Sequence, residues 1–265
     1  MKLDFTIILG FALCVSISHA DTLSYLRFEE GSGYGALDET GLMNGEVLNF
    51  TSVDPGGGDS GGSGWSVSTP SATVPQTGAA NTGSLHFGPG MVDLSNPNAL
   101  DLGLEFTIEM FFRPDQPIIT SSMFGLSPFS SLYWALSETD GNLFFAGWFQ
   151  DELVNDSASM VTIDEWQHFA LVVESTDYSI YIDGQVQDAA TIPAGGEGPY
   201  YFPGDWEGGR SVGDGFSGWI DEFRISDEAL SPSQFLNASI PEPATLGLLA
   251  LGGLVVWFRR KNSAP

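Results

Sequence analysis

Between its two ends the chain alternates apolar and polar residues with a period of two, which is typical of β-strands that bury one face. The alternation is clearest in five runs, at residues 23–29, 106–113, 169–173, 178–182 and 219–225. The 3.6-residue period of a helix does not appear before Ser231, where Ser-Pro-Ser-Gln offers an N-cap, a proline at the first helical position and a glutamine three residues on. The pattern therefore predicts an all-β protein with one short helix starting near Ser231.

Turn signals separate these runs at short intervals. Asp140-Gly141-Asn142 lies between two apolar runs, and Asp183-Gly184 follows another. Such residues favour the positive backbone dihedrals of tight hairpin turns, so two hairpins are predicted. Two longer loops are rich in glycine: residues 55–64, which we expect to be a flexible insertion, and residues 194–209, which contain several aromatic side chains. Many short strands without intervening helices favour a two-sheet antiparallel sandwich.

The first 20 residues have the features of a secretory signal peptide. Lys2 supplies a positive charge, residues 7–15 form an apolar stretch, and Ser18-His19-Ala20 is a small-residue cleavage site. Cleavage after Ala20 is predicted, and the alternative is an uncleaved N-terminal anchor. The one cysteine, Cys14, lies in this segment. The mature chain therefore has neither a disulfide nor a thiol nucleophile.

The C-terminal residues 241–265 combine a helix-breaking tripeptide, called the break below, with an apolar segment and a basic cluster. The prolines of the break prevent a helix from passing through it. The uncharged residues 244–258 are predicted to form a transmembrane helix, although they are fewer than the roughly 20 that span a bilayer comfortably. A basic cluster then marks the cytoplasmic side. The break consists of Pro241, Glu242 and Pro243, and the membrane stop of Arg259, Arg260 and Lys261.

This tail closely resembles the PEP-CTERM signal of bacterial exported proteins over residues 241–261. The resemblance implies cleavage near residues 241–243 by an exosortase-type membrane transpeptidase. The alternative is an ordinary C-terminal anchor that is not processed. With the signal peptide, the tail predicts an exported protein of the cell envelope or extracellular space, anchored transiently in the inner membrane by its C-terminus.

Charge further restricts the partners. The formal net charge is −26, and residues 21–240 hold 32 acidic side chains against four arginines, a charge of −28. Such a surface repels nucleic acid and anionic lipids and attracts cations. Nucleic acid is therefore excluded as a partner, while solubility in a salty or calcium-containing medium explains the acidity without a specific site.

Four segments resemble, in the right order, the landmarks of a concanavalin A-like, laminin-G-like jelly roll. They are residues 25–33 with the loop 38–45, then 106–114, 166–184 and 216–225. The resemblance spans about residues 23–238 and implies one domain, 21–240, built of two curved antiparallel sheets. It says little about activity, because this fold hosts lectins, pentraxins, adhesive modules and glycosidases.

The carboxylates do not form the catalytic pattern of this fold's glycosidases. Those enzymes resemble one another in a Glu-x-Asp-x-x-Glu strand motif, which places its carboxylates on one face, and the chain lacks it. Glu109 is predicted to pair with an arginine, and Asp221 and Glu222 to point to opposite faces of their strand. His86 and His168 are candidate bases or metal ligands, with a structural role in the sheet as the favoured alternative. A non-enzymatic protein is predicted, and a carbohydrate-active enzyme is the alternative.

Calcium is the ion most compatible with the first loop, because calcium takes six to eight oxygen ligands that include backbone carbonyls. The resemblance implies a structural calcium ion where this loop meets the last core strand. Its ligands would be Asp38, the carbonyls near Gly41 and Met43, Asn44, and Asp221. The alternative is that Asp38 and Asn44 form a turn through their own hydrogen bonds.

Aromatic side chains are candidates for stacking against sugar rings, as in related sugar-binding folds. The candidates are Trp134, Trp148, Tyr201 and Trp206. The predicted function is an exported, non-enzymatic binding or adhesion module whose ligand is an extracellular polysaccharide or glycan. The alternatives are a carbohydrate-active enzyme and a structural matrix protein without a discrete ligand.

Overall fold

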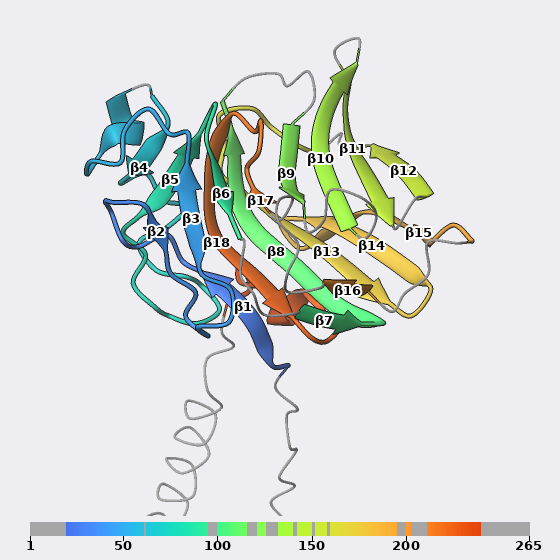
Figure 1. Ribbon diagram of the computed structural model, residues 1–265. Helices are drawn as coiled ribbons and strands as arrows, with labels where there is room; N and C mark the ends of the chain where they lie inside the picture. The colour runs from blue at the N-terminus through green and yellow to red at the C-terminus, as the bar shows by residue number, and fades with distance from the viewer. Residues whose placement is uncertain are drawn as a thin grey trace, which may run out of the picture.

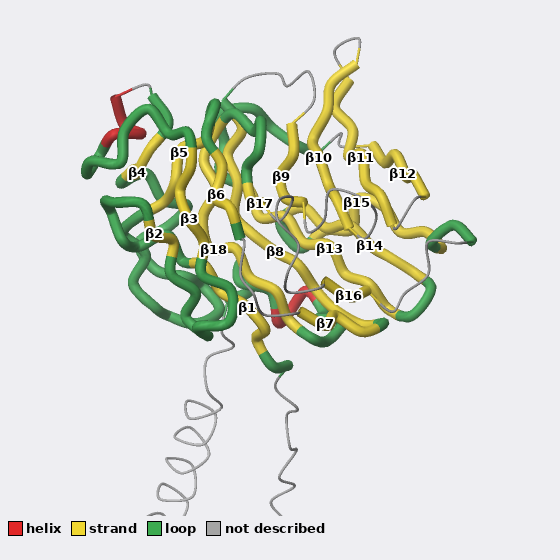
Figure 2. The backbone as a smooth tube through the Cα atoms, viewed as in Figure 1, coloured by secondary structure: helices red, strands yellow, loops and turns green. Residues whose placement is uncertain are grey.

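The computed structural model describes residues 20–60, 62–94, 100–115, 121–125, 132–139, 142–149, 152–157, 160–194, 200–202 and 211–239. This part is all-β, as the alternating pattern predicts, and Figure 2 shows strands and loops with two short helical turns. The predicted signal helix and the apolar C-terminal helix lie outside it. Within the described ranges no helix is long and apolar enough to cross a membrane.

Two antiparallel sheets of eight strands each form the sandwich (Figure 1). The first sheet has the order β15-β14-β13-β8-β18-β5-β4, and β1 also pairs with β18. Its strands are β1 (Thr22–Leu26), β4 (Gly64–Ser66), β5 (Ser84–Phe87), β8 (Glu105–Pro114), β13 (Gln167–Glu174), β14 (Asp177–Ile182), β15 (Gln185–Thr191) and β18 (Gly218–Ser226).

The second sheet has the order β12-β11-β10-β9-β17-β6-β3-β2. Its strands are β2 (Gly35–Ala36), β3 (Gly45–Leu48), β6 (Met91–Asp93), β9 (Ser121–Gly125), β10 (Leu132–Thr139), β11 (Asn142–Phe149), β12 (Glu152–Ser157) and β17 (Ser211–Val212). A separate pair joins β7 (Leu100–Gly103) to β16 (Tyr200–Phe202). All these strands lie between residues 22 and 226, so residues 21–240 contain every strand of the sandwich.

The core lies between the two sheets. Alternate residues of β8 and β13, including Phe106, Phe112 and Phe169, are fully buried there together with residues of the second sheet such as Phe145. Burying one aromatic side chain of this size removes 150–250 Å² from water. The period of two in the sequence thus gives each strand one face for the core.

Both predicted hairpins are present. β10 pairs with β11 along its whole length, and β14 pairs with β15. Between β14 and β15, Asp183 and Gly184 have φ values of 50° and 74°. These two positive dihedrals are the ones that a tight two-residue hairpin turn requires, and glycine accepts them without strain.

A bulge in β18 contradicts the prediction that Asp221 and Glu222 point to opposite faces. The pairing with β8 shifts between Asp221 and Arg224, and Glu222 has a φ of 53°. One extra residue therefore stands on this strand, which reverses the alternation after it. Phe223 lies in the core, while both carboxylates hydrogen-bond to groups on the opposite, outer face of the first sheet.

A C-terminal strap, residues 228–238, crosses the outer face of the first sheet. It begins with the short helix predicted from the Ser231 motif, which is a single 3-10 turn at Pro232–Gln234. Leu230 and Phe235 pack against Ala170 and Val172 of β13, on the face opposite the core. The strap therefore covers a second, smaller apolar layer.

Candidate functional site

A polar pocket of about 380 Å³ lies where β5, β8 and the chain before β18 meet. Its volume falls in the range of 300–1,000 Å³ that is usual for ligand pockets. The pocket is shallow enough to open to solvent, and most of its polar groups are hydroxyls. The lining residues are Thr51, Gly62, Ser63, His86, Phe87, Gly88, Pro89, Asp115 and Ser217.

Asp115 is held at the floor of this pocket, directly after the end of β8. Its Oδ1 accepts a hydrogen bond from Ser217 Oγ at 2.7 Å, and its Oδ2 lies 2.9 Å from His86 Nε2. Its backbone N–H donates to the carbonyl of Ser217. An ionised carboxylate offers about four acceptor positions, so each oxygen keeps capacity for a further donor. Asp115 is therefore a fixed, partly exposed acceptor.

His86 ties the other wall of the pocket to Asp115. Its Nδ1 lies 2.6 Å from the carbonyl oxygen of Gly62, and its Nε2 faces the carboxylate. Both partners are acceptors, so both bonds form at once only when each ring nitrogen carries a proton.

A row of stacked side chains holds His86 in place. Trp219 on β18 is paired with His86 on β5 and with Arg113 on β8. The imidazole stacks on the indole at 4.2 Å, and the guanidinium lies 4.4 Å from the indole centroid. Trp219 Nε1 donates to Ser66 Oγ at 3.1 Å. Because neighbours on both strands pack against the indole, this row makes the pocket rigid and does not offer Trp219 as a platform for a sugar ring.

The glycine-rich segment 55–64, predicted to be a flexible insertion, contributes Gly62 and Ser63 to the lining of the pocket. It contains the 3-10 turn η1 (Gly57–Ser60) and leads into β4. A Cβ on Gly58 would lie 2.5 Å from the Gly64 carbonyl oxygen and 2.8 Å from the Cβ of His86. Glycine is needed there because the backbone approaches β5 closely.

Comparison with known families agrees with this two-sheet architecture. Residues 88–235, more than half of the chain, match the family described as "Concanavalin A-like lectin/glucanases superfamily". The chain belongs to this superfamily. Residues 239–261 match the PEP-CTERM protein-sorting motif, which indicates an exported protein processed at the membrane by an exosortase. No similar chain was found among the curated proteins.

Solved structures are similar to this chain at low sequence identity. The Trypanosoma rangeli sialidase is 12% identical with a TM-score of 0.50, over 82% of this chain and 32% of the sialidase. Domain 4 of AbnA, a GH43 extracellular arabinanase from Geobacillus stearothermophilus, solved in complex with arabinotriose, is 18% identical with a TM-score of 0.49, over 81% and 96% of the two chains. The botulinum neurotoxin serotype D binding domain is 11% identical with a TM-score of 0.47, over 80% and 50%. The sialidase similarity shows the fold alone.

In this concanavalin A-like domain, Asp38 has its acceptor positions filled. Its Oδ1 accepts from the backbone N–H of Tyr25 and Thr40, and its Oδ2 accepts from Thr40 Oγ1 and the Met43 N–H. The Asp38 N–H donates to Asn44 Oδ1 at 2.8 Å, and Gly41 donates its N–H to the Asp38 carbonyl. These four bonds build the turn of the alternative interpretation and fill the usual acceptor positions of the carboxylate, while calcium binding by Asp38 and Asn44 stays a prediction.

Asp221 has the opposite character. It is fully buried, and its Oδ2 accepts from Asn81 Nδ2 at 2.8 Å, while its Oδ1 and Asn81 Oδ1 have no hydrogen-bond partner. Burial, with the negative charge of Glu222 adding to it, raises the pKa of Asp221 well above its ordinary value. These two unpartnered oxygens suit either a proton on the Asp221 carboxyl or a bound cation. Among the described residues no group of three acidic, histidine or cysteine side chains suits a metal ion, so any calcium ligands here would include backbone carbonyls or water.

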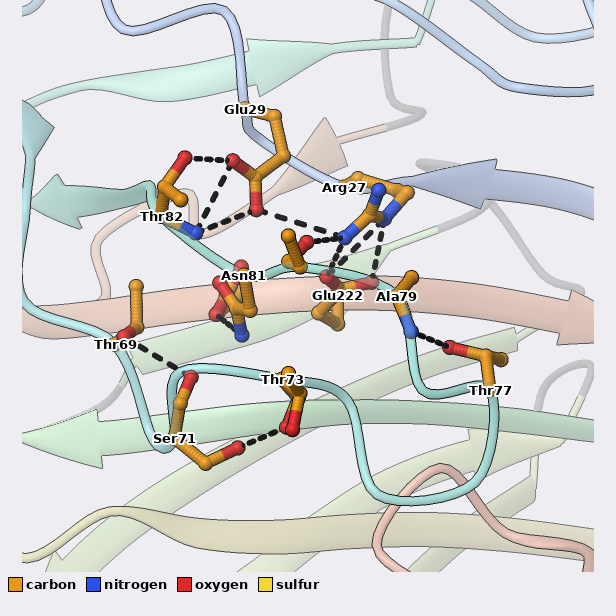
Figure 3. A network of polar contacts seen from close by, with 12 residues as sticks. Arg27, Glu29, Thr69, Ser71, Thr73, Thr77, Ala79, Asn81, Thr82 and Glu222 are labelled. Atoms are coloured by element: carbon orange, nitrogen blue, oxygen red, sulfur yellow. Dashed lines mark hydrogen bonds and ion pairs between the residues drawn. The ribbon is translucent and has the colours of Figure 1, made fainter.

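Around Glu222, the residue after Asp221 in β18, carboxylates and one arginine fasten a loop onto the strand (Figure 3). Arg27 forms an ion pair with Glu222 at 2.9 Å and donates to the carbonyl of Ala80. Glu29 accepts from the backbone N–H of Thr82 at 2.9 Å. This network holds residues 80–82 above the bulge and keeps Asn81 next to Asp221.

Of the four aromatic candidates, Trp134 is the one whose side chain the structure describes. Trp134 is fully buried in the core against Phe149 and Tyr178, so it offers no ring to a surface ligand. Trp148 lies in β11 and Tyr201 in β16, and only their strand positions are described. Trp206 lies outside the described residues, as do the processing and membrane-stop residues.

Glu109 and His168 form a structural group, as predicted. Arg224 Nε donates to Glu109 Oε1 at 2.8 Å, and Glu109 Oε2 lies 2.7 Å from His168 Nε2. The backbone N–H of Leu236 donates to the same Oε2, and Arg224 Nη2 donates to the carbonyl of Gln234. This buried group fastens the C-terminal strap to the sheet and has no access to a ligand.

Proposed function

We propose that the mature protein is a non-enzymatic carbohydrate-binding module of the cell envelope or extracellular matrix, and that its sugar site is the pocket around Asp115. The observation that carries this proposal is the arrangement of Asp115, Ser217 and His86. A carboxylate with spare acceptor capacity, fixed among hydroxyl groups at the edge of a lectin-type sandwich, matches the hydrogen-bonding needs of a sugar. In this proposal recognition relies on hydrogen bonds, and not on the aromatic candidates.

The test is binding of residues 21–240 to an array of polysaccharides and oligosaccharides. The wild-type domain should bind at least one glycan, and Asp115→Ala should abolish that binding. Glu174→Gln, at an exposed position on β13, serves as the matched control and should bind normally. Retention of full affinity by Asp115→Ala would exclude this pocket as the site.

Incubating the same glycans with the domain and measuring the reducing ends released distinguishes a binding protein from an enzyme. The proposal predicts binding without release of products. Cleavage that Asp115→Ala abolishes would instead assign the pocket to a carbohydrate-active enzyme. A matrix protein without a discrete ligand would bind nothing on the array.

Export supplies the setting of this function. We propose that the signal peptide is removed after Ala20, and that residues 244–258 hold the chain in the inner membrane until an exosortase-type transpeptidase cleaves near Pro241, Glu242 and Pro243. The sorting-motif match supports this sequence of events. Extracellular polysaccharide would then be the ligand within reach of the released or attached domain.

We also propose that calcium stabilises the fold next to Asp221. The orphaned Oδ1 atoms of Asp221 and Asn81 support this position, and the excess of carboxylates favours any cation. Asp38, Asn44, Gly41 and Met43 would then contribute through the turn that they form and not as ligands.

A further inference from the structure

We infer that the ligand of the Asp115 pocket is an uncharged polysaccharide, and that Asp115 is the residue that rejects acidic ones. This inference rests on the proposed function. It follows from which charges line the pocket, which charges surround it and which acceptor positions remain open.

Among the residues that the structure describes, the pocket provides no uncompensated cation for an anionic sugar. Two of these described lining residues are ionisable, His86 and Asp115, and they face each other at 2.9 Å. The Nδ1 of His86 is already directed at the Gly62 carbonyl. A sugar carboxylate or sulfate would therefore meet Asp115 without a free positive partner, which is unfavourable at short range.

The arginine beside the pocket is also engaged. The Arg113 guanidinium lies over the Trp219 ring, and its Nη2 is 4.0 Å from Asp164. Asp164 is well exposed, with 66% of its side chain accessible. Residues 21–240 carry a formal charge of −28, so the surrounding field repels an approaching polyanion.

The open acceptor positions suit neutral hydroxyl groups. Each Asp115 oxygen has one hydrogen-bond partner, Ser217 or His86, and keeps lone pairs for a second donor. A hydroxyl is a donor, whereas a deprotonated acid group is an acceptor only. Two neighbouring hydroxyls of one sugar ring would satisfy both oxygens of the carboxylate, which combines binding and selection in one side chain.

The test compares one polymer in two charge states. The best neutral polysaccharide from the array is measured against residues 21–240 by calorimetry, next to its carboxymethylated derivative with the same backbone. The neutral form should bind with an affinity that does not change between 20 and 300 mM salt, since no ionic contact is screened. The carboxymethylated form should bind at least tenfold more weakly at low salt, and salt should reduce that difference.

Asp115→Asn provides the second arm. It keeps the shape of the side chain but removes the charge, so affinity for the neutral polymer should fall about tenfold. Discrimination against the carboxymethylated form should shrink to the part caused by the surrounding negative field, which salt screens. Glu174→Gln is the control for an equal change of net charge. Tighter binding of the acidic polymer, weakening with salt, would overturn the inference and leave the proposed function standing. Absence of binding to every glycan would overturn both.

Discussion

Asp221 and Glu222 are neighbours in sequence, yet both side chains lie on the outer face of the same strand. The bulge at Glu222 produces this arrangement and places two buried carboxylates side by side. Glu222 has Arg27 as its counterion, whereas Asp221 has a neutral asparagine. Burial raises the pKa of both groups, and Asp221 in particular favours a bound proton or cation over a free charge.

The first prediction is that Asp221→Asn stabilises the metal-free domain at neutral pH. A raised pKa in the folded state means that the protonated carboxyl is favoured there. The stabilising contribution of the protonated Asp221 carboxyl is therefore fully present below about pH 4, the ordinary pKa of aspartate. It decreases as the pH rises from there toward the raised pKa of the folded state. Asparagine mimics the protonated form at all pH values. Melting curves with chelator should show a higher melting temperature for the variant at pH 7 and no difference near pH 3.

The second prediction concerns calcium at the same position. Calcium at a hundred times its dissociation constant should raise wild-type stability by about 2.7 kcal/mol, and Asp221→Asn should lose this gain. Magnesium at equal ionic strength is the control for general screening, because magnesium demands a tighter shell. Equal responses of wild type and variant to both ions would mean that only the acidic surface binds cations.

The third prediction is that Asp38 stabilises the fold independently of calcium. Asp38→Ala removes four hydrogen bonds to the first loop. It leaves buried N–H groups unsatisfied, so unfolding free energy should fall by about 2–4 kcal/mol. Urea titrations should give the same loss with calcium and with chelator. A loss seen in calcium alone would restore Asp38 as a ligand.

The fourth prediction is that Glu109→Gln loosens the C-terminal strap. Burial alone would raise the pKa of Glu109, but the charge of Arg224 and the bond to His168 outweigh it, so the pKa is lowered. Its contribution is therefore present above about pH 4.3 and is lost as the pH falls through the depressed folded value. Removing one partner of a buried charged group costs about 3–5 kcal/mol. Limited proteolysis at pH 7 should cut the variant first within residues 228–238, and unchanged protection there would contradict the role of Glu109.

The fifth prediction concerns processing. In a host with the sorting enzyme, the intact mass of the exported protein should lack residues 246–265, because the sorting motif precedes an apolar run and a basic stop. A host without that enzyme is the control and should retain them. Full-length chains from the first host would contradict the prediction.

The sequence predicts the sandwich well because strands such as β8, β13 and β14 follow the period of two, and turn pairs such as Asp183-Gly184 leave few alternatives. It predicts that Glu109 pairs with an arginine, because a lone carboxylate inside an apolar strand needs a partner, but it does not single out Arg224 as that arginine. The bulge at Glu222 is not predicted, since nothing in the order of residues marks the shift in pairing.

The pocket is missed for a different reason. Its residues spread over 166 positions, from Thr51 to Ser217, and no short motif links them. The glycine-rich segment 55–64 contains the one usable signal, because glycines there permit close approach of backbone to His86. The glycine content of this loop predicts flexibility, whereas the packing around Gly58 places the loop along one side of the pocket.

The location of the sugar site is tested most directly by nuclear magnetic resonance of the histidine rings. Residues 21–240 contain two histidines, His86 in the pocket and the buried His168. During titration with the neutral polysaccharide, the ring signals of His86 should shift in a saturable manner, while those of His168 stay unchanged as an internal control. Saturable binding that leaves the His86 signals unmoved would contradict the account.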